Sequence, residues 1–369
     1  MKKQTSAATE TKNKGREIMD YSGKTIFVGI DIHKKDWQVA SRCENMFLSN
    51  HRMQAKSHVL IDYLHRHFPG ARFSCAYECC AWGFNLQRKL TAVGMECIVV
   101  HAADLPSTNK ERVNKTDKID ARRLSEHLEN GSLKAIHVPT EQRQKERSLI
   151  RYRKEVVNQI TACCNRIKSA LKYHGIDVPE QFDKRGCWSN AFMVWIEQTA
   201  RQDMDVEDTL LFMLEDLRGQ KNLLAKIERK LREKMRGERH IVQTRLATSV
   251  PGIGPITATQ FLLEIGDVSR FGGFDSLNNY IGLNPGSHNS GDHEQSTGIS
   301  GRKHNQLRSA FVEAAWVAIR IDPPMGDAYR KLTQRMEGNK AIIRIARKLL
   351  RRLRTVLLTG IEYHKGIVA

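Results

Sequence analysis

Two acidic residues stand at the ends of short apolar runs that are typical of buried β-strands. Asp31 closes the run that begins at Thr25, and Glu78 closes the run that begins at Arg72. The carboxyl ends of strands form the edge of an α/β sheet at which sites are commonly built. Either acid by itself is an ordinary strand terminator, so the hypothesis of a shared site depends on further acids elsewhere in the chain.

A second pair of acids lies in the segment Lys115–Arg123. Asp117 and Asp120 are spaced i and i+3, so on a helix they share one face, about 5–6 Å apart at Cβ. Two adjacent carboxylates repel each other, and a cation between them is the simplest way to keep them together. The plain alternative is an N-terminal turn whose acids balance the helix dipole. Counted with Asp31 and Glu78, the pair favours a site.

Hard oxygen ligands suit Mg²⁺ or Mn²⁺ rather than zinc. Two such ions held about 4 Å apart clamp a scissile phosphate and stabilise the attacking and leaving oxygens. The four acids therefore predict a phosphoryl-transfer site, and His33 beside Asp31 could assist, although a surface histidine is the more common case. The eight cysteines contain no CxxC pair, which excludes a zinc ribbon and indicates structural thiols in a reducing cytoplasm.

The elements that position these acids follow from hydrophobic periodicity. Five runs are predicted to be strands: Thr25–Ile30, Trp37–Ser41, Met46–Arg52, Arg72–Tyr77 and Glu96–His101. Three further segments are predicted to be helices: Ser57–Phe68, Gly83–Val93 and Asp117–Leu128. A meander of three strands followed by helix–strand alternation is the order of a ribonuclease-H-like sheet.

Two long amphipathic helices are predicted in the middle of the chain, at Thr140–His174 and Asp205–Arg236. They could pair with each other or with another subunit, and the sequence leaves both open. Trp188 and Trp195 lie between them and are expected in the core of a helical hairpin. The middle is therefore predicted to be all helical.

The remainder of the chain is predicted to be mainly helical. The turn Val250–Pro255 carries Gly252 and Gly254 and leads into an apolar helix, as in a helix-hairpin-helix loop that grips a phosphate backbone. A tight turn between two helices has equal weight. A flexible loop is expected at Gly282–Ser300, then a helix at Gln306–Ile321, then a basic helix after Pro323-Pro324.

The charge of the chain favours a polyanionic partner. Its 60 Lys and Arg against 41 Asp and Glu give a net charge of +19, and the mean hydropathy is −0.50. We expect nucleic acid as the partner. The absence of an apolar run near 18 residues excludes a membrane span, and the polar N-terminus is not a secretory signal. We expect a cytoplasmic protein.

The runs GIDIHKK, AYECCAWG and NKTDKIDARRL resemble the DEDD domain of bacterial insertion-sequence transposases, a domain similar to the RuvC Holliday-junction resolvase. The match covers about residues 25–130. It implies a RuvC-like α/β domain whose acids Asp31, Glu78, Asp117 and Asp120 are catalytic and hold Mg²⁺ or Mn²⁺.

Residues 280–308 are similar to the second domain of the bridge-RNA-guided DEDD recombinases, in which a loop serine before glycine attacks a DNA phosphate. Matched to that motif, Ser290 is the expected nucleophile and Ser287 the reserve. The cations Arg302, Lys303 and Arg308 could neutralise the phosphate. This chain departs from the Ser-Lys-Arg-Gly-like run of many relatives there, so individual roles for the cations are not assigned.

The resemblance implies four parts: a flexible N-terminus (1–24), a RuvC-like DEDD domain (25–135), a helical, coiled-coil-like linker domain (140–238) and a serine-bearing transposase domain (241–369). It further implies donor and target DNA, a non-coding guide (bridge) RNA, a homo-oligomer (dimer or tetramer) and association with the bacterial nucleoid. The predicted function is an RNA-guided recombinase working through a serine–DNA intermediate. The alternatives are a metal-dependent Holliday-junction-type nuclease and a non-catalytic nucleic-acid-binding protein.

Overall fold

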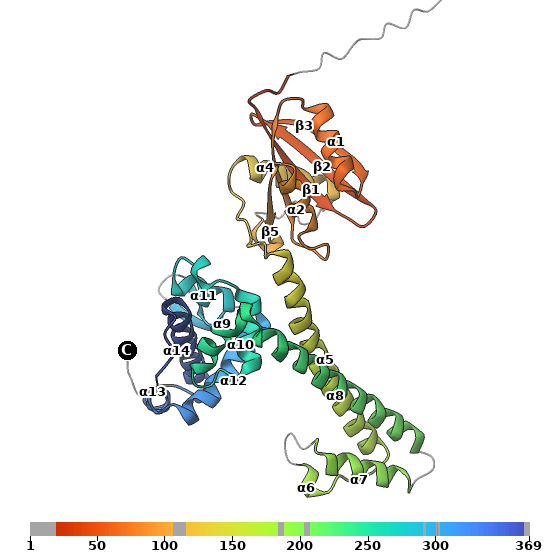
Figure 1. Ribbon diagram of the computed structural model, residues 1–369, viewed down its shortest axis with the longest axis vertical. Helices are drawn as coiled ribbons and strands as arrows, with labels where there is room; N and C mark the ends of the chain where they lie inside the picture. The colour runs from red at the N-terminus through yellow and green to blue at the C-terminus, as the bar shows by residue number, and fades with distance from the viewer. Residues whose placement is uncertain are drawn as a thin grey trace, which may run out of the picture. The chain divides into compact units, whose positions relative to one another are not determined.

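The structure is a computed structural model that describes residues 20–105, 116–183, 188–202, 207–290, 293–299, 301 and 303–364, without the side chains of 183, 285–290 and 293–298. Contacts divide the chain into two compact units, Met1–Pro139 and Thr140–Ala369 (Figure 1). We describe each unit by itself. The predicted further division of the second unit at about residue 240 stays a prediction.

The first unit is built on a five-stranded mixed sheet. Strand β1 (Thr25–Ile32) pairs antiparallel with β2 (Asp36–Cys43), which pairs antiparallel with β3 (Met46–Gln54). On its other side β1 pairs in parallel with β4 (Arg72–Glu78), and β4 pairs in parallel with β5 (Glu96–Val100). The order β3-β2-β1-β4-β5 fits a ribonuclease-H-like or RuvC-like sheet.

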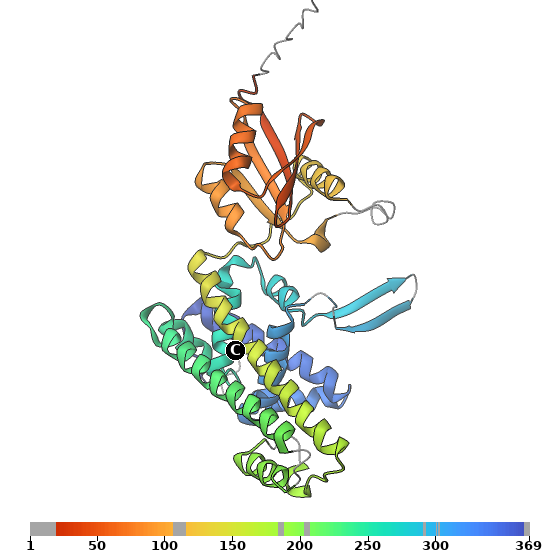
Figure 2. The ribbon, with the colours of Figure 1, turned by 90° about the vertical axis from the view of Figure 1, so that its right-hand side faces the viewer.

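Helices cover both faces of this sheet. Side chains alternate along a strand, so Ile26, Val28 and Ile30 of β1 point to one face, where they join a core with residues of α1 (Ser57–His67) and α2 (Asn85–Ala92). The short helix η1 (Ala102–Asp104) follows β5. The opposite face is covered by α4 (Asp117–Glu129), which contacts β1, β2 and β4 (Figure 2).

Contact between α4 and the sheet depends on Gly29 of β1. A Cβ placed on Gly29 would lie 2.1 Å from the carbonyl oxygen of Ala121 and 2.4 Å from the amide nitrogen of Ser125. Both atoms belong to the backbone of α4, so they cannot move aside without moving the helix. The absence of a side chain at position 29 therefore sets how closely α4 approaches β1.

Two acids that directly follow the predicted strand ranges Thr25–Ile30 and Arg72–Tyr77 lie inside the strands of the structure. The structure extends β1 to Ile32 and β4 to Glu78. The antiparallel ladder explains the extension of β1, because Asp31 pairs with Gln38 and Ile32 pairs with Trp37. Asp31 therefore lies within the sheet, two residues from Gly29 and on the same face as α4.

The second unit begins with two long helices, α5 (Glu141–Tyr173) and α8 (Glu207–Arg236), which pack against each other within the chain. Between them lie α6 (Glu180–Asp183) and α7 (Asn190–Ala200). Phe192 of α7 is fully buried here and stacks on Trp195, and Trp188 lies against the same ring. Both tryptophans therefore belong to a hydrophobic core, as predicted.

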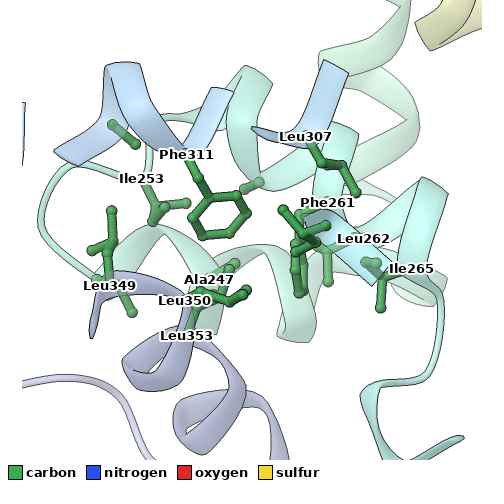
Figure 3. Close-up of a cluster of buried hydrophobic side chains, with 14 of the residues drawn as sticks. Ala247, Ile253, Phe261, Leu262, Ile265, Leu307, Phe311, Leu349, Leu350 and Leu353 are labelled. Atoms are coloured by element: carbon green, nitrogen blue, oxygen red, sulfur yellow. The ribbon is translucent and has the colours of Figure 1, made fainter. Parts of the chain in front are cut away.

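Helices also form most of the rest of the second unit: α9 (Glu238–Ser249), α10 (Pro255–Ile265), α11 (Phe274–Ile281), α12 (Asn305–Ile321), α13 (Pro323–Thr333) and α14 (Gly338–Thr359), with the short η2 (Val268–Arg270). Phe261 and Phe311 meet edge to face in their shared core, against Leu350 of α14 (Figure 3). No helix in the described parts of the chain combines the length and the apolar character needed to cross a bilayer.

Two expectations for this unit were wrong. The single basic C-terminal helix is two helices, α13 and α14, and Gly338 at the start of α14 lies against the Tyr329 hydroxyl of α13. The segment expected as a loop at Gly282–Ser300 contains an antiparallel hairpin, β6 (Pro285–Ser290) and β7 (His293–Ile299). The hairpin was missed because its strands are polar, although the Gly-Asp dipeptide in the sequence is a recognised hairpin signal.

We predict that Gly29→Val lowers the free energy of unfolding of the first unit by about 3 kcal/mol, because its side chain meets the α4 backbone. Urea unfolding, with hydrogen exchange at β1 and α4 to assign the transition, measures this. The matched control is Gly219→Ala on the exposed face of α8, where an added Cβ meets nothing within 4 Å. The control should gain about 0.5–1 kcal/mol. Equal stability of Gly29→Val and wild type would contradict the packing argument.

Candidate active site

Three side chains meet at the end of β1. The Nε2 atom of His33 lies 3.1 Å from Oδ2 of Asp31 and 3.4 Å from Oδ1 of Asp117. One ligand atom from each of the three residues lies within 4.8 Å of the other two. Asp117 of the helix therefore lies in one cluster with Asp31 and His33 at the end of the strand. Asp117 is at least 84 positions away from the other two in the sequence.

Strand register brings Glu78 to the same edge. The last parallel pair between β1 and β4 joins Ile30 to Tyr77, so the next residues along the two strands are Asp31 and Glu78. Side chains at matching positions of parallel neighbours point to the same face. Glu78 is partly buried and already has an interaction within the protein.

The first turn of α4 supplies the other two acids. Thr116 caps this helix by accepting a hydrogen bond from the amide of Ile119, which fixes Asp117 as the first helical residue. Asp120 follows one turn later with a side chain only 12% exposed, and Arg123 Nη1 lies 3.5 Å from its Oδ1. Asp117 is 62% exposed. The two acids of the pair thus differ sharply in their contact with water.

The pKa of the Asp31 carboxyl is raised, first because the side chain is partly buried and then because Asp117 and Asp120 repel a negative charge there, while His33 opposes the shift. Burial works to lower the pKa of His33, but the charge and hydrogen bond of Asp31 and the charge of Asp117 outweigh it, so that pKa is raised. Burial, aided by the repulsion from the neighbouring acids, therefore disfavours the charged form of Asp31.

These residues fit a divalent cation. The donors are carboxylate oxygens, which both Mg²⁺ and Mn²⁺ take as ligands, and one imidazole nitrogen, which suits a transition metal such as Mn²⁺. The raised pKa of Asp31 shows that its charged form is disfavoured in this partly buried position, and a bound cation would favour that form. Asp31 and Asp117, with Glu78 and Asp120 beside them, are the residues that would hold such an ion.

Hydrogen bonds fasten α4 to the sheet at both ends. Near its N-terminus, Asn50 of β3 donates to the carbonyl of Lys118 over 3.0 Å, and Gln38 of β2 donates to the Asn50 side chain. At its C-terminus, Glu129 accepts from Arg42 at 2.8 Å and from the backbone amide of Asn45 at 2.7 Å. The β1–β3 meander therefore holds the helix that carries two of the acids.

We predict that Asn50→Ala speeds hydrogen exchange in the first turn of α4 about fivefold, because removing one hydrogen bond costs about 1 kcal/mol of local stability. Exchange measured by mass spectrometry tests this. The matched control is Asn85→Ala at the exposed start of α2, which should leave α4 unchanged. Unchanged exchange at Asp117–Ala121 in Asn50→Ala would show that Asn50 does not brace the helix.

The two candidate serines lie on strand β6 of the second unit. Ser287 pairs with Ser296 of β7, and Ser290, the last residue of β6, pairs with His293. The four acids belong to the first unit and the two serines to the second. Their role as nucleophile remains a prediction.

Residues that flank this hairpin in the sequence contact the helices of the second unit. On the entering side, Asn284 exchanges side-chain hydrogen bonds with Asn278 and Asn279 of α11, and Asn278 is fully buried. On the leaving side, His304 caps α12 through Nδ1, which accepts from the amide of Leu307, and its Nε2 lies 3.4 Å from Glu264. Nε2 therefore carries the proton in the tautomer that satisfies both contacts.

Glu264 of α10 is the centre of a buried polar cluster. Its side chain is fully buried and accepts two hydrogen bonds from Arg151 of α5, at 2.7 and 2.8 Å. Arg147 donates to the carbonyls of Leu263 and Glu264 at the end of the same helix. Burial works to raise the pKa of Glu264, but the hydrogen bonds of Arg151 and His304 and the charge of Arg151 lower it to about 2.

We predict that the second unit loses on the order of 3 kcal/mol of stability as the pH falls from about 4.5 to about 2. Glu264 stays ionised in the folded state while its unfolded counterpart takes up a proton near pH 4.5, so its stabilisation is complete above that pH and is lost below it. Urea unfolding across this range measures the effect. Glu264→Gln should flatten the profile and cost about 2 kcal/mol at pH 7, whereas exposed Glu313→Gln should do neither.

The residues predicted to contact nucleic acid differ in how exposed they are. Gly252, with φ +92°, lies against α12, where a Cβ would meet the Ala314 carbonyl at 2.4 Å, so packing alone accounts for this glycine. Gly254 is exposed at the N-cap of α10. Lys303 is exposed, and partial burial lowers the pKa of Arg308. Arg302 lies outside the described residues. Nucleic-acid contact by these residues stays a prediction.

Sequence reasoning missed the residues that position the site. Three of these residues have no side chain that could take part in catalysis: Gly29, Gln38 and Asn50. For Gly29 there was a signal in the sequence, because a glycine inside an apolar strand indicates a close approach of another backbone. Glu264 was a second signal in the sequence. It lies inside the apolar run Ile256–Ile265, and a carboxylate buried in such a run needs a partner of opposite charge, here Arg151.

Comparison with known proteins finds two regions of similarity in the chain. Residues 28–175 match a family described as Transposase, the DEDD transposase domain of IS110 elements, and residues 244–330 match the Transposase IS116/IS110/IS902 family. A transposase-like protein of Sinorhizobium fredii is 27% identical over 353 residues, which cover 92% of this chain and 82% of that protein.

Two other relatives extend the comparison. The transposase for insertion sequence element IS1111A of Coxiella burnetii is 23% identical over 239 residues, 64% of either chain. A pilin gene-inverting protein of Moraxella bovis is 41% identical over 114 residues, 28% of this chain and 34% of that protein.

Acids at the edge of a mixed sheet, in a chain whose matched regions are both transposase domains, define an enzyme of DNA transposition and recombination that uses a divalent metal ion. Its two matched regions are similar to the two domains of IS110-family transposases, and this similarity supports a transposase or recombinase enzyme.

Proposed function

We propose that this transposase is an RNA-guided recombinase that cuts and rejoins DNA strands through a serine–DNA phosphodiester, with Mg²⁺ or Mn²⁺ at the acids. The metal-dependent part of the proposal is carried by the cluster of Asp31, His33 and Asp117, whose ligand atoms lie within 4.8 Å of one another at the sheet edge. The serine and the guide RNA follow from the resemblance described above. Glu78 and Asp120 complete the acidic set by strand register and helix position.

The acids would hold the metal, which supplies a positive charge that stabilises the oxygens around a reacting phosphate. Asp31 and Glu78 approach from the strands and Asp117 and Asp120 from α4, so the site presents oxygen donors from two directions. The rigid attachment of α4 to the sheet keeps those donors in place when substrate binds.

In the proposed reaction the Ser290 hydroxyl oxygen forms a bond to phosphorus, and the bond from phosphorus to one deoxyribose oxygen breaks. The serine proton leaves, and the departing deoxyribose oxygen takes up a proton. In the second half the hydroxyl of another strand attacks the same phosphorus and releases the serine. The number of phosphodiesters is conserved, so no external energy source is required.

Guide RNA, donor and target DNA and a homo-oligomer, dimer or tetramer, are part of the proposal. They follow from the resemblance to bridge-RNA-guided recombinases, and the net charge of +19 is consistent with holding more than one nucleic acid. Association with the bacterial nucleoid follows from the same DNA binding.

We predict that Ser290→Ala abolishes a covalent protein–DNA adduct that wild type forms with labelled junction DNA, the RNA encoded beside the gene, and Mg²⁺. Denaturing gels detect the adduct. Ser296→Ala, across the hairpin from Ser287, is the matched control and should keep it. An adduct lost only in Ser287→Ala would transfer the role to Ser287. Cleavage that survives both changes would identify a junction nuclease that uses water.

In the same assay Asp120→Asn and Asp117→Asn should each abolish turnover, because the acids hold the ion that the reaction needs. RNA binding, measured by filter retention, should stay within about twofold of wild type, since no acid helps to bind a polyanion. Loss of RNA binding with turnover retained would contradict the assignment of the acids. No phosphoryl transfer in Mg²⁺ or Mn²⁺ would leave a binding protein.

A further inference from the structure

His33 is a histidine among the acids of the candidate active site. Its side chain is 49% exposed, yet its Nε2 contacts two carboxylates from different elements, Asp31 of β1 and Asp117 of α4. Its backbone is also fixed, because the amide of His33 donates to the carbonyl of Asp36 over 3.2 Å and closes the turn between β1 and β2. The β1–β2 turn therefore holds the backbone that positions the imidazole beside the acids.

The spacing of these three atoms suits ligands of one ion. Mg²⁺ and Mn²⁺ prefer octahedral coordination, in which donors about 2.1 Å from the ion lie about 3 Å from their nearest neighbours. The Nε2 atom lies 3.1 Å and 3.4 Å from the two carboxylate oxygens. The imidazole nitrogen thus already lies at the separation from each of the two carboxylate oxygens that a shared ion requires, and all three donors lie within 4.8 Å of one another.

We propose that His33 is a ligand, through Nε2, of one divalent ion together with Asp31 and Asp117, and that it makes this transposase select Mn²⁺ over Mg²⁺. Mg²⁺ takes almost exclusively oxygen ligands, whereas an imidazole nitrogen is a good ligand for transition metals. A site of four carboxylates alone would lack this preference. The inference rests on the proposed metal-dependent function and adds a residue and a selectivity to it.

The alternative role for His33 is a hydrogen-bonded bridge that holds the acids together without an ion. The two roles predict opposite effects of removing the side chain. A bridge competes with the ion for the same oxygens, so its loss leaves metal affinity unchanged or raises it. A ligand contributes to binding, so its loss weakens affinity, and weakens it more for Mn²⁺ than for Mg²⁺.

The test uses the full chain with Mn²⁺ alone as the probe, and Mg²⁺ as the competitor. Pulsed electron paramagnetic resonance of bound Mn²⁺ should show coupling to a ¹⁴N nucleus in wild type and in His58→Ala, an exposed histidine of α1 that serves as the matched control. The coupling should vanish in His33→Ala. Mn²⁺ affinity should fall about tenfold or more in that variant, with Mg²⁺ affinity changed less than about threefold.

Each other outcome overturns a defined claim. Bound Mn²⁺ with no nitrogen coupling in wild type, or unchanged or tighter Mn²⁺ binding in His33→Ala, overturns the inference and leaves the proposed recombinase intact. Absence of Mn²⁺ and Mg²⁺ binding in wild type overturns the metal-dependent function itself. Hydrogen exchange of β1 and α4 confirms that the His33→Ala chain is folded before its affinities are compared.

Discussion

The candidate active site depends on one close contact between backbones, that of α4 with β1 at Gly29. An ordinary side chain at this position would hold the helix away from the sheet, because the nearest atoms are the Ala121 carbonyl and the Ser125 amide. Asp120 directly precedes Ala121 and Asp117 lies one turn earlier, while Asp31 is two residues beyond Gly29 on the same face. The distance between α4 and β1 therefore determines how close the acids of the helix come to Asp31.

Polar contacts at the margins make that arrangement rigid. Asn50 and Glu129 tie the two ends of α4 to the meander, so neither translation nor tilt of the helix is free. The second unit has similar contacts beside the serine-bearing hairpin, where the flanking residues Asn284 and His304 contact its helices. In both units, elements that carry the proposed chemistry are held by neutral or buried polar groups that have no part in the reaction.

Much of this could be predicted from the sequence, because hydrophobic alternation identifies the strands and the i, i+3 spacing identifies the acids on α4. The structure confirms a mixed sheet followed by helices. Positions of Asn50 and Glu264 could not be predicted, since their partners, Lys118 and Arg151, are 68 and 113 residues away. The hairpin β6–β7 was missed because its strands are polar, and composition then favours a loop.

Gly29 also has a consequence for reading related genes. The four acids of the candidate active site are the residues by which a related sequence would first be compared with this one. A relative that had gained a side chain at position 29 would keep Asp31, Glu78, Asp117 and Asp120 in its sequence, yet its helix could not bring them together. The intact acids alone would then misidentify an inactive gene as a working one.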